Sequence, residues 1–454
     1  MKKTDEIKVS VIIYVKNTVD YIEKCIRSVM NQTLQEIEIL IVDGGSTDGT
    51  LDIIERVKKE DNRIRFFHSI ASVGAQFNLG LQEARGQYIG ICEADDYILP
   101  EMYEKQYQIA LENQLDVVRA GYYQIFHVNN KEYRFKLKSC YQDEWTEKVI
   151  VSNRNTFFLE QGVNGFWNGI YRRNFLLENH IGMNETKGAA YQDISFSFLV
   201  QMYAEKIWFM KEAFYCYRID NLNASVNSLH GIEFHISEYE ELKKRLKNSN
   251  QWEQYKNMFF SWELVSYRWF LGELPNDLKK DNAKKVYHIL NGQNQEEKFD
   301  TKRMMETVKL FAETLDNETE FLQCILSGTE NKIALLEYME TLLKKNEEII
   351  LFGVGHLGKI IRQFFALFRK EIFLTDNSKF LQSSGLMGEK IYHPEDMTRR
   401  FPHGRYIIAS VNDAKEMNEQ LIKLGIPGEK ILICDDEEFF LRRIFVKAGK
   451  YGES

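Results

Sequence analysis

The sequence predicts an α/β protein in which two separate parallel sheets flank a helical region. Three observations predict this class. Short apolar runs alternate with helical patterns up to about residue 125, strand signals disappear from about 231 to 345, and a second alternation surrounds a glycine-rich turn near residue 353. At 454 residues the chain is too long for one ordinary core. We therefore expect three domains, over residues 1–230, 231–345 and 346–454.

The first alternation predicts a parallel sheet with crossover helices. Its four apolar runs are expected to be strands at Lys8 to Val15, Glu38 to Val42, Ile64 to His68 and Tyr88 to Cys92. Apolar residues recur at helical spacing between them, from about Ile22, Thr50 and Gln76. The expected caps are Asn17 or Thr18 for the first helix and Ser46, Thr47 or Asp48 for the second.

Two acidic turns follow the second and fourth strands. Glu93-Ala94-Asp95-Asp96 comes directly after the fourth strand, and Asp43 opens a glycine-containing turn after the second. Because open α/β sheets bind ligands at the carboxyl ends of their strands, these acids are candidates for one site. Crowded carboxylates repel one another unless a cation lies among them, which points to a hard divalent ion. Taken singly, the first turn could be solvated surface and the second a plain turn with a helix cap.

Composition excludes several classes of protein. The net charge of -8 gives no reason to expect nucleic acid as a partner. No run approaches the roughly 20 apolar residues of a membrane span, and the first residues lack the apolar core of a signal peptide, so we expect a cytoplasmic protein. The six cysteines form no CxxC pair, which argues against a zinc site or a disulfide framework and predicts small apolar core residues.

Several blocks of residues carry a family resemblance. In the first hundred residues they are Val9 to Ile13, Ile41 to Thr50, Asn78 to Gly80, Ala84 to Gly86, Tyr88 with Ile89, and Glu93 to Asp96. In this order and spacing they resemble the family 2 glycosyltransferases. Trp167 to Arg173, followed by Glu185 to Phe196, is similar to the acceptor half of members that build bacterial surface polysaccharides. The resemblance implies a GT-A fold, a nucleotide-sugar donor and a divalent metal, Mn²⁺ or Mg²⁺.

The resemblance also implies roles for residues of the donor site. Glu93 and Asp95 take the positions of the metal-binding DxD motif, Asp96 is the acid that follows, and Asp43 takes the position that contacts the nucleobase, typically uracil. The other implied donor contacts are Ile13, Tyr14, Val15, Asn78 and Arg218. The chain differs from the usual family pattern at Tyr14, where proline is common, and at Glu93, where aspartate is common. The basic residue that usually precedes the Asn-x-Gly block is also missing.

Asp193 takes the position of the family's catalytic base, and Gln192 stands where a glutamate usually precedes it. From the residues alone, Asp193 begins an apolar helix, where the macrodipole favours its ionised form, and a plain N-cap is the alternative. Arg218 would balance the diphosphate charge or pair with Asp220, and His230 could be a third metal ligand or a surface histidine. The implied chemistry is an inverting single displacement in which Asp193 takes the proton of the acceptor hydroxyl.

Residues 231–345 show helical patterns with apolar and lysine-rich faces, including Tyr239, Leu242, Leu246 and Phe270 on the apolar side. We expect bundle core and solvated surface here, with a loop at 291–298. An acceptor platform or a membrane-surface contact is the alternative for the aromatic and basic faces, because polysaccharide acceptors are often lipid-linked.

The C-terminal alternation contains a GxGxxG turn formed by Gly353, Gly355 and Gly358, and Asp376 follows the next strand. This pattern supports a dinucleotide or nucleotide site. The region also resembles the small Rossmann-like modules appended to polysaccharide-assembly enzymes, which implies a structural, regulatory or sugar-nucleotide-sensing role. No hydride-transfer residues are recognisable downstream, so NAD is the less favoured cofactor.

Three functional hypotheses follow. The leading one is metal-dependent transfer of a sugar, from a UDP-sugar to a hydroxyl of a saccharide or lipid-linked acceptor, in cell-surface polysaccharide synthesis. The alternatives are an NAD(P)-dependent oxidoreductase acting through the C-terminal domain and a non-catalytic scaffold of an assembly complex. A scaffold has no need of Glu93, Asp95 and Asp193 together. A peripheral contact with the inner face of the plasma membrane and a homo-oligomer remain open.

Overall fold

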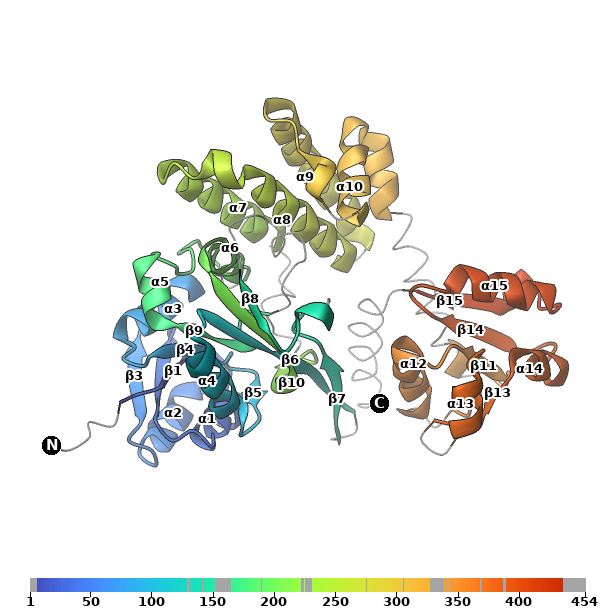
Figure 1. Cartoon of the computed structure of the whole chain (residues 1–454), viewed down its shortest axis with the longest axis horizontal. Helices are drawn as coiled ribbons and strands as arrows, with labels where there is room; N and C mark the ends of the chain where they lie inside the picture. The colour runs from blue at the N-terminus through green and yellow to red at the C-terminus, as the bar shows by residue number, and fades with distance from the viewer. Residues whose placement is uncertain are drawn as a thin grey trace. The chain divides into compact units, whose positions relative to one another are not determined.

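The computed structural model describes residues 6–128, 131–140, 143–151, 165–188, 190–221, 224, 231–274, 276–304, 306–326, 339, 341–343, 345–367, 370–386 and 389–435. Contacts divide the chain into two compact units. The first runs to residue 321 apart from 126–133 and 272–280, and the second contains these two segments and the rest of the chain. Figure 1 shows the first sheet in blue to green and the second in orange to red. The division into three domains stays a prediction.

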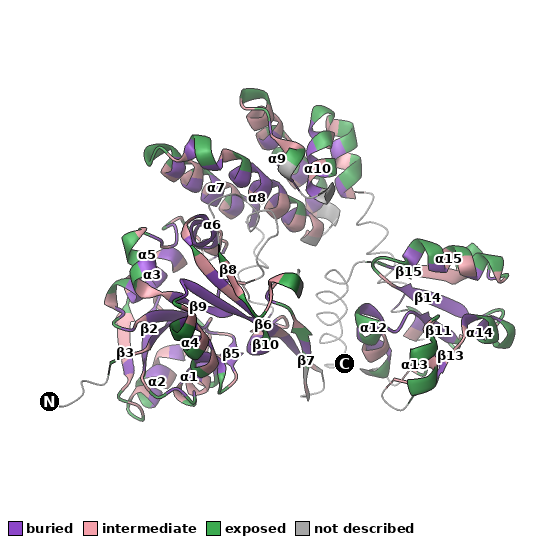
Figure 2. Ribbon diagram, viewed as in Figure 1, coloured by how far each residue is buried: buried purple, intermediate pink, exposed green. Residues whose placement is uncertain are grey.

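The first sheet begins with four parallel strands, as predicted. These are β1 (Val9–Val15), β2 (Ile37–Asp43), β3 (Ile64–His68) and β4 (Tyr88–Ile91), in the order β3-β2-β1-β4. Every residue of β1, β2 and β4 is buried, as expected of strands covered on both faces (Figure 2). Their carboxyl ends meet at one edge of the sheet, so the turns after β2 and β4 lie near each other.

Mixed pairing completes this sheet. The remaining strands are β5 (Tyr97–Ile98), β6 (Val117–Val128), β7 (Lys131–Leu137), β8 (Val149–Val151), β9 (Gly169–Arg172) and β10 (Lys206–Arg218). β9 runs antiparallel between β4 and β6, and β5 runs antiparallel to the end of β10. The pairing of Tyr215 with Ile98 and of Cys216 with Tyr97 brings the end of β10 beside the acidic turn.

The helices of this part are α1 (Ile22–Met30), α2 (Thr50–Lys58), α3 (Val73–Glu83), α4 (Met102–Asn113), α5 (Arg173–Glu178) and α6 (Asp193–Tyr203). The predicted N-cap positions of the first two are wrong, although Asp48 Oδ1 accepts a hydrogen bond of 3.0 Å from the Thr50 amide at the start of α2. The N-cap of α1 is Tyr21, and that of α2 is Gly49 at a φ of 99°. Asn17 instead accepts a hydrogen bond from the Thr47 amide, so it joins the turn after β1 to the turn after β2.

The helical region contains α7 (Gly231–Asn248), α8 (Trp252–Glu273), α9 (Asn276–Glu296) and α10 (Glu306–Glu313). Short 3₁₀ turns lie at Asp143–Trp145, Thr301–Arg303, Thr314–Asp316 and Gly428–Lys430. The apolar faces predicted here are buried, including Tyr239, Leu242, Leu246 and Phe270. The loop predicted at 291–298 is wrong, because α9 continues to Glu296. Asn291 and Gln293 donate hydrogen bonds to Leu315 O and to Glu263, and these tertiary contacts hold polar residues in the helix.

The second sheet has five parallel strands in the order β13-β12-β11-β14-β15. They are β11 (Ile349–Phe352), β12 (Phe373–Thr375), β13 (Ile391–Tyr392), β14 (Arg405–Ala409) and β15 (Ile431–Cys434). Their helices are α12 (His356–Leu367), α13 (Lys379–Ser384), α14 (Pro394–Arg400) and α15 (Ala414–Lys423). This confirms the second α/β fold predicted from the glycine-rich turn.

Two predictions made from composition concern membrane-spanning helices and the cysteines. Within the described ranges, no helix combines the length and apolarity needed to cross a membrane. All six cysteines carry free thiols, and Cys25, Cys92, Cys216 and Cys434 are buried. Cys140 is only half-buried and Cys324 is exposed, so the prediction of apolar core residues is wrong for Cys324.

Candidate active site

The edge formed by β1 and β4 brings Tyr14 and Glu93 together. β1 and β4 are parallel with Ile12 opposite Ile91, so Tyr14 lies level with Glu93, two residues beyond that pair. The Tyr14 hydroxyl donates a hydrogen bond of 2.8 Å to Glu93 Oε1. Tyr14 therefore contributes a side chain to this edge, in addition to the backbone contact that the sequence suggested.

The acidic turn is bound to the end of β10. Asp96 is buried and accepts hydrogen bonds from the Tyr215 hydroxyl at 2.8 Å and the Arg218 amide at 2.7 Å. Asp95 accepts one from Asn221 Nδ2 at 2.8 Å, and its carbonyl accepts one from Arg218 Nε at 2.9 Å. Asp96 thus anchors the turn, while Asp95 stays half-buried beside it.

The charge of Asp193 acts on residues at this edge. Burial, with the nearby charges of Asp95 and Asp193, raises the pKa of Glu93 to about 8. Burial raises the pKa of Tyr14 well above its usual value, and the charges of Glu93, Asp193 and Asp95 raise it further. The charges of Asp95 and Asp193, from separate segments of the chain, thus act on the same two side chains, Glu93 and Tyr14, and a shared catalytic site for the three acids stays a prediction.

The acids offer oxygen ligands for a hard cation. The hydrogen bonds above use Glu93 Oε1 and Asp95 Oδ2, which leaves the second oxygen of each carboxylate for a cation, as far as the described residues show. Repulsion among unpaired acids would decrease when a cation binds, so the donor set fits Mn²⁺ or Mg²⁺. No three His, Cys, Asp or Glu side chains in the described ranges form a metal cage, so a cation here would need further ligands from a bound molecule or water. His230 lies outside the described residues.

Asp193 is the first residue of α6, and the N-cap position belongs to Gln192. No side-chain hydrogen bond caps this helix, so the N-cap interpretation of Asp193 is wrong. Burial raises the pKa of Asp193 to about 6, which outweighs the lowering expected at a helix start. A carboxylate with this pKa is mostly ionised at pH 7 and is a stronger base than an exposed aspartate.

Asp43 and Asn78 both support loops of the site. Asp43 is fully buried, and its carboxylate accepts hydrogen bonds from the Gly45 and Ser46 amides, with His68 Nδ1 at 3.4 Å. The Asn78 side chain exchanges two hydrogen bonds with the Met183 backbone, of 2.9 and 3.0 Å. The loop that precedes α6 is thereby attached to α3. The contacts of Asp43 and Asn78 with a donor stay predictions.

Arg218 forms the ion pair that the sequence left open. Its Nη1 lies 3.3 Å from Asp220 Oδ1, and its guanidinium lies 4.7 Å from the centre of the Tyr21 ring. Tyr215 and Asn221 were not assigned roles from the sequence, although both hydrogen-bond to the acidic turn. A tyrosine in a strand and an asparagine after it carry no local signal for such contacts, because the pairing of β10 with β5 creates them.

The glycine-rich turn of the second unit is tightly closed. A Cβ at Gly358 would lie 1.9 Å from Gly353 O, and Gly353 has a φ of +96°, so both positions favour glycine. Gly355 has open space around it. Asp376 accepts hydrogen bonds from the Val354 and Ser378 amides at 3.0 and 2.8 Å. Asp376 therefore holds the turn itself, and a nucleotide site there stays a prediction.

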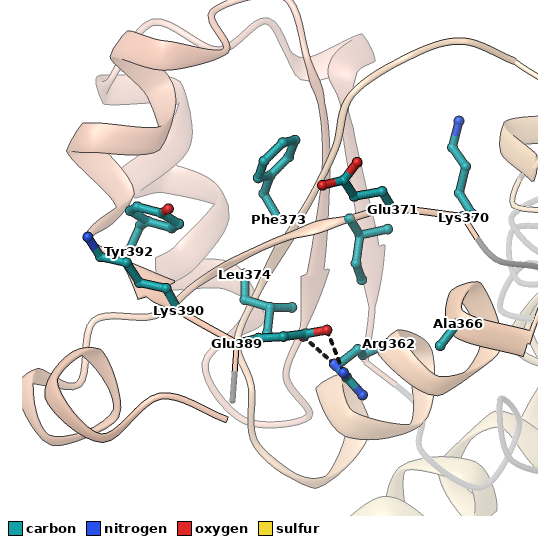
Figure 3. Close-up of a pocket in the computed structure, with 10 residues that line it drawn as sticks. Arg362, Ala366, Lys370, Glu371, Phe373, Leu374, Glu389, Lys390 and Tyr392 are labelled. Carbon is teal, nitrogen blue, oxygen red and sulfur yellow. Dashed lines mark hydrogen bonds and ion pairs between the residues drawn. The ribbon is translucent and has the colours of Figure 1, made fainter. Parts of the chain in front are cut away.

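A hollow in this unit lies away from that turn (Figure 3). It has a volume of about 270 Å³ and is lined by residues that begin β12 and β13 and by the second half of α12. In Figure 3 the Arg362 and Glu389 side chains point toward each other and are joined by an ion pair. The hollow is thus at the amino ends of the strands, whereas the GxGxxG turn is at their carboxyl ends.

Comparison with known proteins gives consistent matches. The family model described as Glycosyl transferase family 2 matches residues 10–178. EpsH of Bacillus subtilis (strain 168), named as a glycosyltransferase, is 33% identical over 254 residues, which cover 55% of this chain and 72% of EpsH. EpsJ of the same organism, also named as a glycosyltransferase, is 30% identical over 241 residues, which cover 52% of this chain and 67% of EpsJ.

A solved structure shares the fold. S. aureus TarS 1-349, determined in complex with UDP-GlcNAc, has a TM-score of 0.51 at 17% identity. The alignment covers 72% of this chain and 92% of that one. The likeness extends well beyond the residues that the family model matches.

Proposed function

The chain belongs to the family 2 glycosyltransferases, and on that premise we propose that it transfers a sugar from a UDP-sugar to a hydroxyl of a saccharide or lipid-linked acceptor. The reaction would invert the configuration of the anomeric carbon and serve cell-surface polysaccharide synthesis. The observation that supports the proposal is that the charges of Asp95 and Asp193 both act on Glu93, which directly follows Cys92 beyond the end of β4.

Asp193 would act as the general base. It would accept the proton of the acceptor hydroxyl while that oxygen forms a bond to the anomeric carbon and the bond from this carbon to the diphosphate oxygen breaks. The electron pair of the broken bond stays on the nucleoside diphosphate. A pKa of about 6 supports this role, because the group is ionised near neutral pH yet retains basicity.

The rest of the site would hold the donor and balance its charge. Glu93 and Asp95 would hold Mn²⁺ or Mg²⁺, and a bound cation would supply charge neutralisation for the leaving diphosphate. Arg218, whose backbone amide is tied to Asp96, would add positive charge on the same side. Asp43 and the backbone from Ile13 to Val15 would line the nucleobase pocket.

The test is a transfer assay with the purified full-length protein. A panel of UDP-sugars is incubated with Mn²⁺, with Mg²⁺ or with a chelator, and the release of UDP is followed. UDP-GlcNAc is the first donor to try, because TarS was solved with it. We expect UDP release with at least one donor, loss of release with the chelator, and a loss of about 10³-fold or more for Asp193→Asn, which removes the base.

Three results would contradict the proposal. An Asp193→Asn variant with near wild-type turnover would exclude Asp193 as the base. The anomeric configuration of the first product is determined by NMR. A product with the same configuration as the donor would exclude inversion. Absence of turnover with every nucleotide sugar, together with absence of thermal stabilisation by UDP and Mn²⁺, would remove the proposed activity itself.

A further inference from the structure

The loop that leads to Asp193 rests on a buried acid of the helical region. Glu238 of α7 is fully buried, and no cation pairs with it in the part of the chain that the structure describes. Its Oε1 accepts a hydrogen bond from the Thr186 hydroxyl, and its Oε2 accepts one from Asn184 Nδ2 at 3.1 Å. Burying a carboxyl without a cation is costly unless hydrogen bonds compensate, and both bonds come from one short loop.

The same loop is tied to the first turn of α6. The backbone N–H of Asn184 donates to Ser195 Oγ at 2.9 Å, and the Ser195 hydroxyl donates to the Gln192 backbone carbonyl, also at 2.9 Å. Ser195 lies two residues after Asp193 on α6. The contact of Glu238 with Asn184 is therefore linked to the turn of helix that carries the base.

A strained residue just before the base is held by α7 and α8. Tyr191 has a φ of 74°, which is rare for a bulky residue and persists only where the surroundings fix it. Its ring stacks on His235 of α7 with ring centres 3.7 Å apart, and Phe270 of α8 packs against it edge-on at 6.2 Å. His235 is buried, and its Nε2 lies 3.2 Å from Ser266 Oγ.

We propose that Glu238 is a positioning residue for the transfer reaction, which holds the described loop residues 184–188 and 190–192 so that Asp193 faces the donor edge. The helical region is then part of the transferase site, although it lies beyond the boundary at residue 230 expected from the sequence. The proposal rests on the proposed function, in which Asp193 is the base. Asn78 of α3 donates hydrogen bonds to Met183 O, directly before this loop, and to Glu185 Oε1 within it, so the loop is held from two sides.

The test compares variants that remove or keep the hydrogen bonds between Glu238 and the loop. Glu238→Leu removes both acceptor oxygens, Thr186→Val removes one donor at nearly constant shape, and Glu238→Gln keeps an acceptor for Asn184. The matched control is Glu240→Gln, because Glu240 is an exposed acid on the same helix. For each variant, kcat, KM for donor and acceptor, calorimetric binding of UDP with Mn²⁺, and the thermal midpoint are measured.

We expect kcat to fall about 10- to 100-fold in Glu238→Leu and less in Thr186→Val, because a displaced base loses its alignment with the acceptor. Binding of UDP and donor KM should change less than about twofold. Glu238→Gln should recover most of the activity, and Glu240→Gln should equal the wild type.

Three outcomes would overturn the inference: a wild-type kcat in Thr186→Val, an equal loss of UDP binding and of kcat in the variants, or a Glu238→Gln as slow as Glu238→Leu. If Glu238→Leu does not fold, Thr186→Val and Glu238→Gln decide the question. Failure of the proposed function itself is recognised separately, because the wild-type enzyme would then release no UDP.

Discussion

Tyr14 and Glu93 are two of the positions at which the donor half departs from the pattern usual in the family, and they contact each other. The Tyr14 hydroxyl donates to Glu93 Oε1 at 2.8 Å. The longer side chain of glutamate places its carboxylate about one bond further out than aspartate would, and the hydroxyl restrains that carboxylate. This hydrogen bond also opposes the rise in the pKa of Glu93 caused by burial.

Tyr14→Phe should therefore weaken cation binding. Without the hydroxyl, the Glu93 carboxylate loses a hydrogen bond of about 1 kcal/mol and competes less well for a cation against a proton. We expect the Kd of Mn²⁺, measured by calorimetry in the presence of UDP, to increase roughly fivefold.

Tyr88→Phe serves as the control for this change. Its hydroxyl donates to the Leu115 carbonyl at 3.1 Å, in the connection between α4 and β6, and makes no hydrogen bond to the acidic turn among the described residues. Equal Mn²⁺ affinity in Tyr14→Phe and the wild type would show that the hydroxyl does not restrain Glu93 in the bound state.

At the scale of elements, α7 and α8 combine apolar packing with buried acids. Glu263 of α8 is buried, its Oε1 accepts a hydrogen bond from Gln293, and its Oε2 has no partner among the described residues. Burial raises the pKa of Glu263 to about 8. Helical periodicity predicted the apolar face of these helices but not the acid inside it, because a glutamate at a core position looks like any other polar residue in a helix.

Glu263→Gln should change how stability depends on pH. The folded protein keeps the Glu263 proton up to about pH 8, whereas the unfolded chain releases it near pH 4.5. The free energy of unfolding of the wild type should therefore decrease as the pH rises through this window, relative to the variant. We expect the variant to be more stable by about 1–3 kcal/mol at pH 8.5 and nearly equal at pH 5, measured by urea unfolding.

The exposed Glu253 of the same helix provides the comparison, since Glu253→Gln should show no such pH dependence. A Glu263→Gln variant whose stability relative to the wild type is the same at pH 5 and pH 8.5 would contradict the raised pKa.

At the scale of the whole molecule, the chain combines a glycosyltransferase unit with a second α/β unit that has its own sheet and core. The core of the second unit includes Ile350, Phe352, Tyr406 and Leu421. In that unit the Asp376 carboxylate accepts a hydrogen bond from the Val354 amide within the glycine-rich turn. We therefore expect the second unit to unfold separately and to leave the chemistry of transfer to the first.

Gly358→Ala tests this separation. The added methyl would lie 1.9 Å from Gly353 O, so the turn must shift and the second unit should lose stability, by about 2 kcal/mol or more. Calorimetric scanning should show one transition moved to lower temperature, with kcat unchanged at 25 °C. Gly355→Ala is the matched control, because nothing lies within 4 Å of the added methyl. Loss of transfer at 25 °C in Gly358→Ala alone would show that the two units depend on each other.

Much of this molecule follows from local sequence patterns. The strands β1 to β4, the acids after β2 and β4, and the start of α6 at Asp193 were all predicted, because apolar periodicity, glycine turns and acidic clusters act over a few neighbouring positions. The predicted N-cap positions of α1 and α2 and the loop at 291–298 were wrong. At each of these places a contact from a distant segment outweighed the local preference.

Packing between distant segments accounts for the rest. It buries Asp43 against its own turn, sets the Tyr14 hydroxyl on Glu93, and brings Glu238 beneath the loop that carries Asp193. It also raises the pKa of Asp193 to about 6, against the direction expected at a helix start. Desolvation depends on every segment that covers a group, and no local pattern contains that information. Local sequence patterns therefore identify which acids form the candidate site, whereas the tertiary structure determines their protonation state and their alignment.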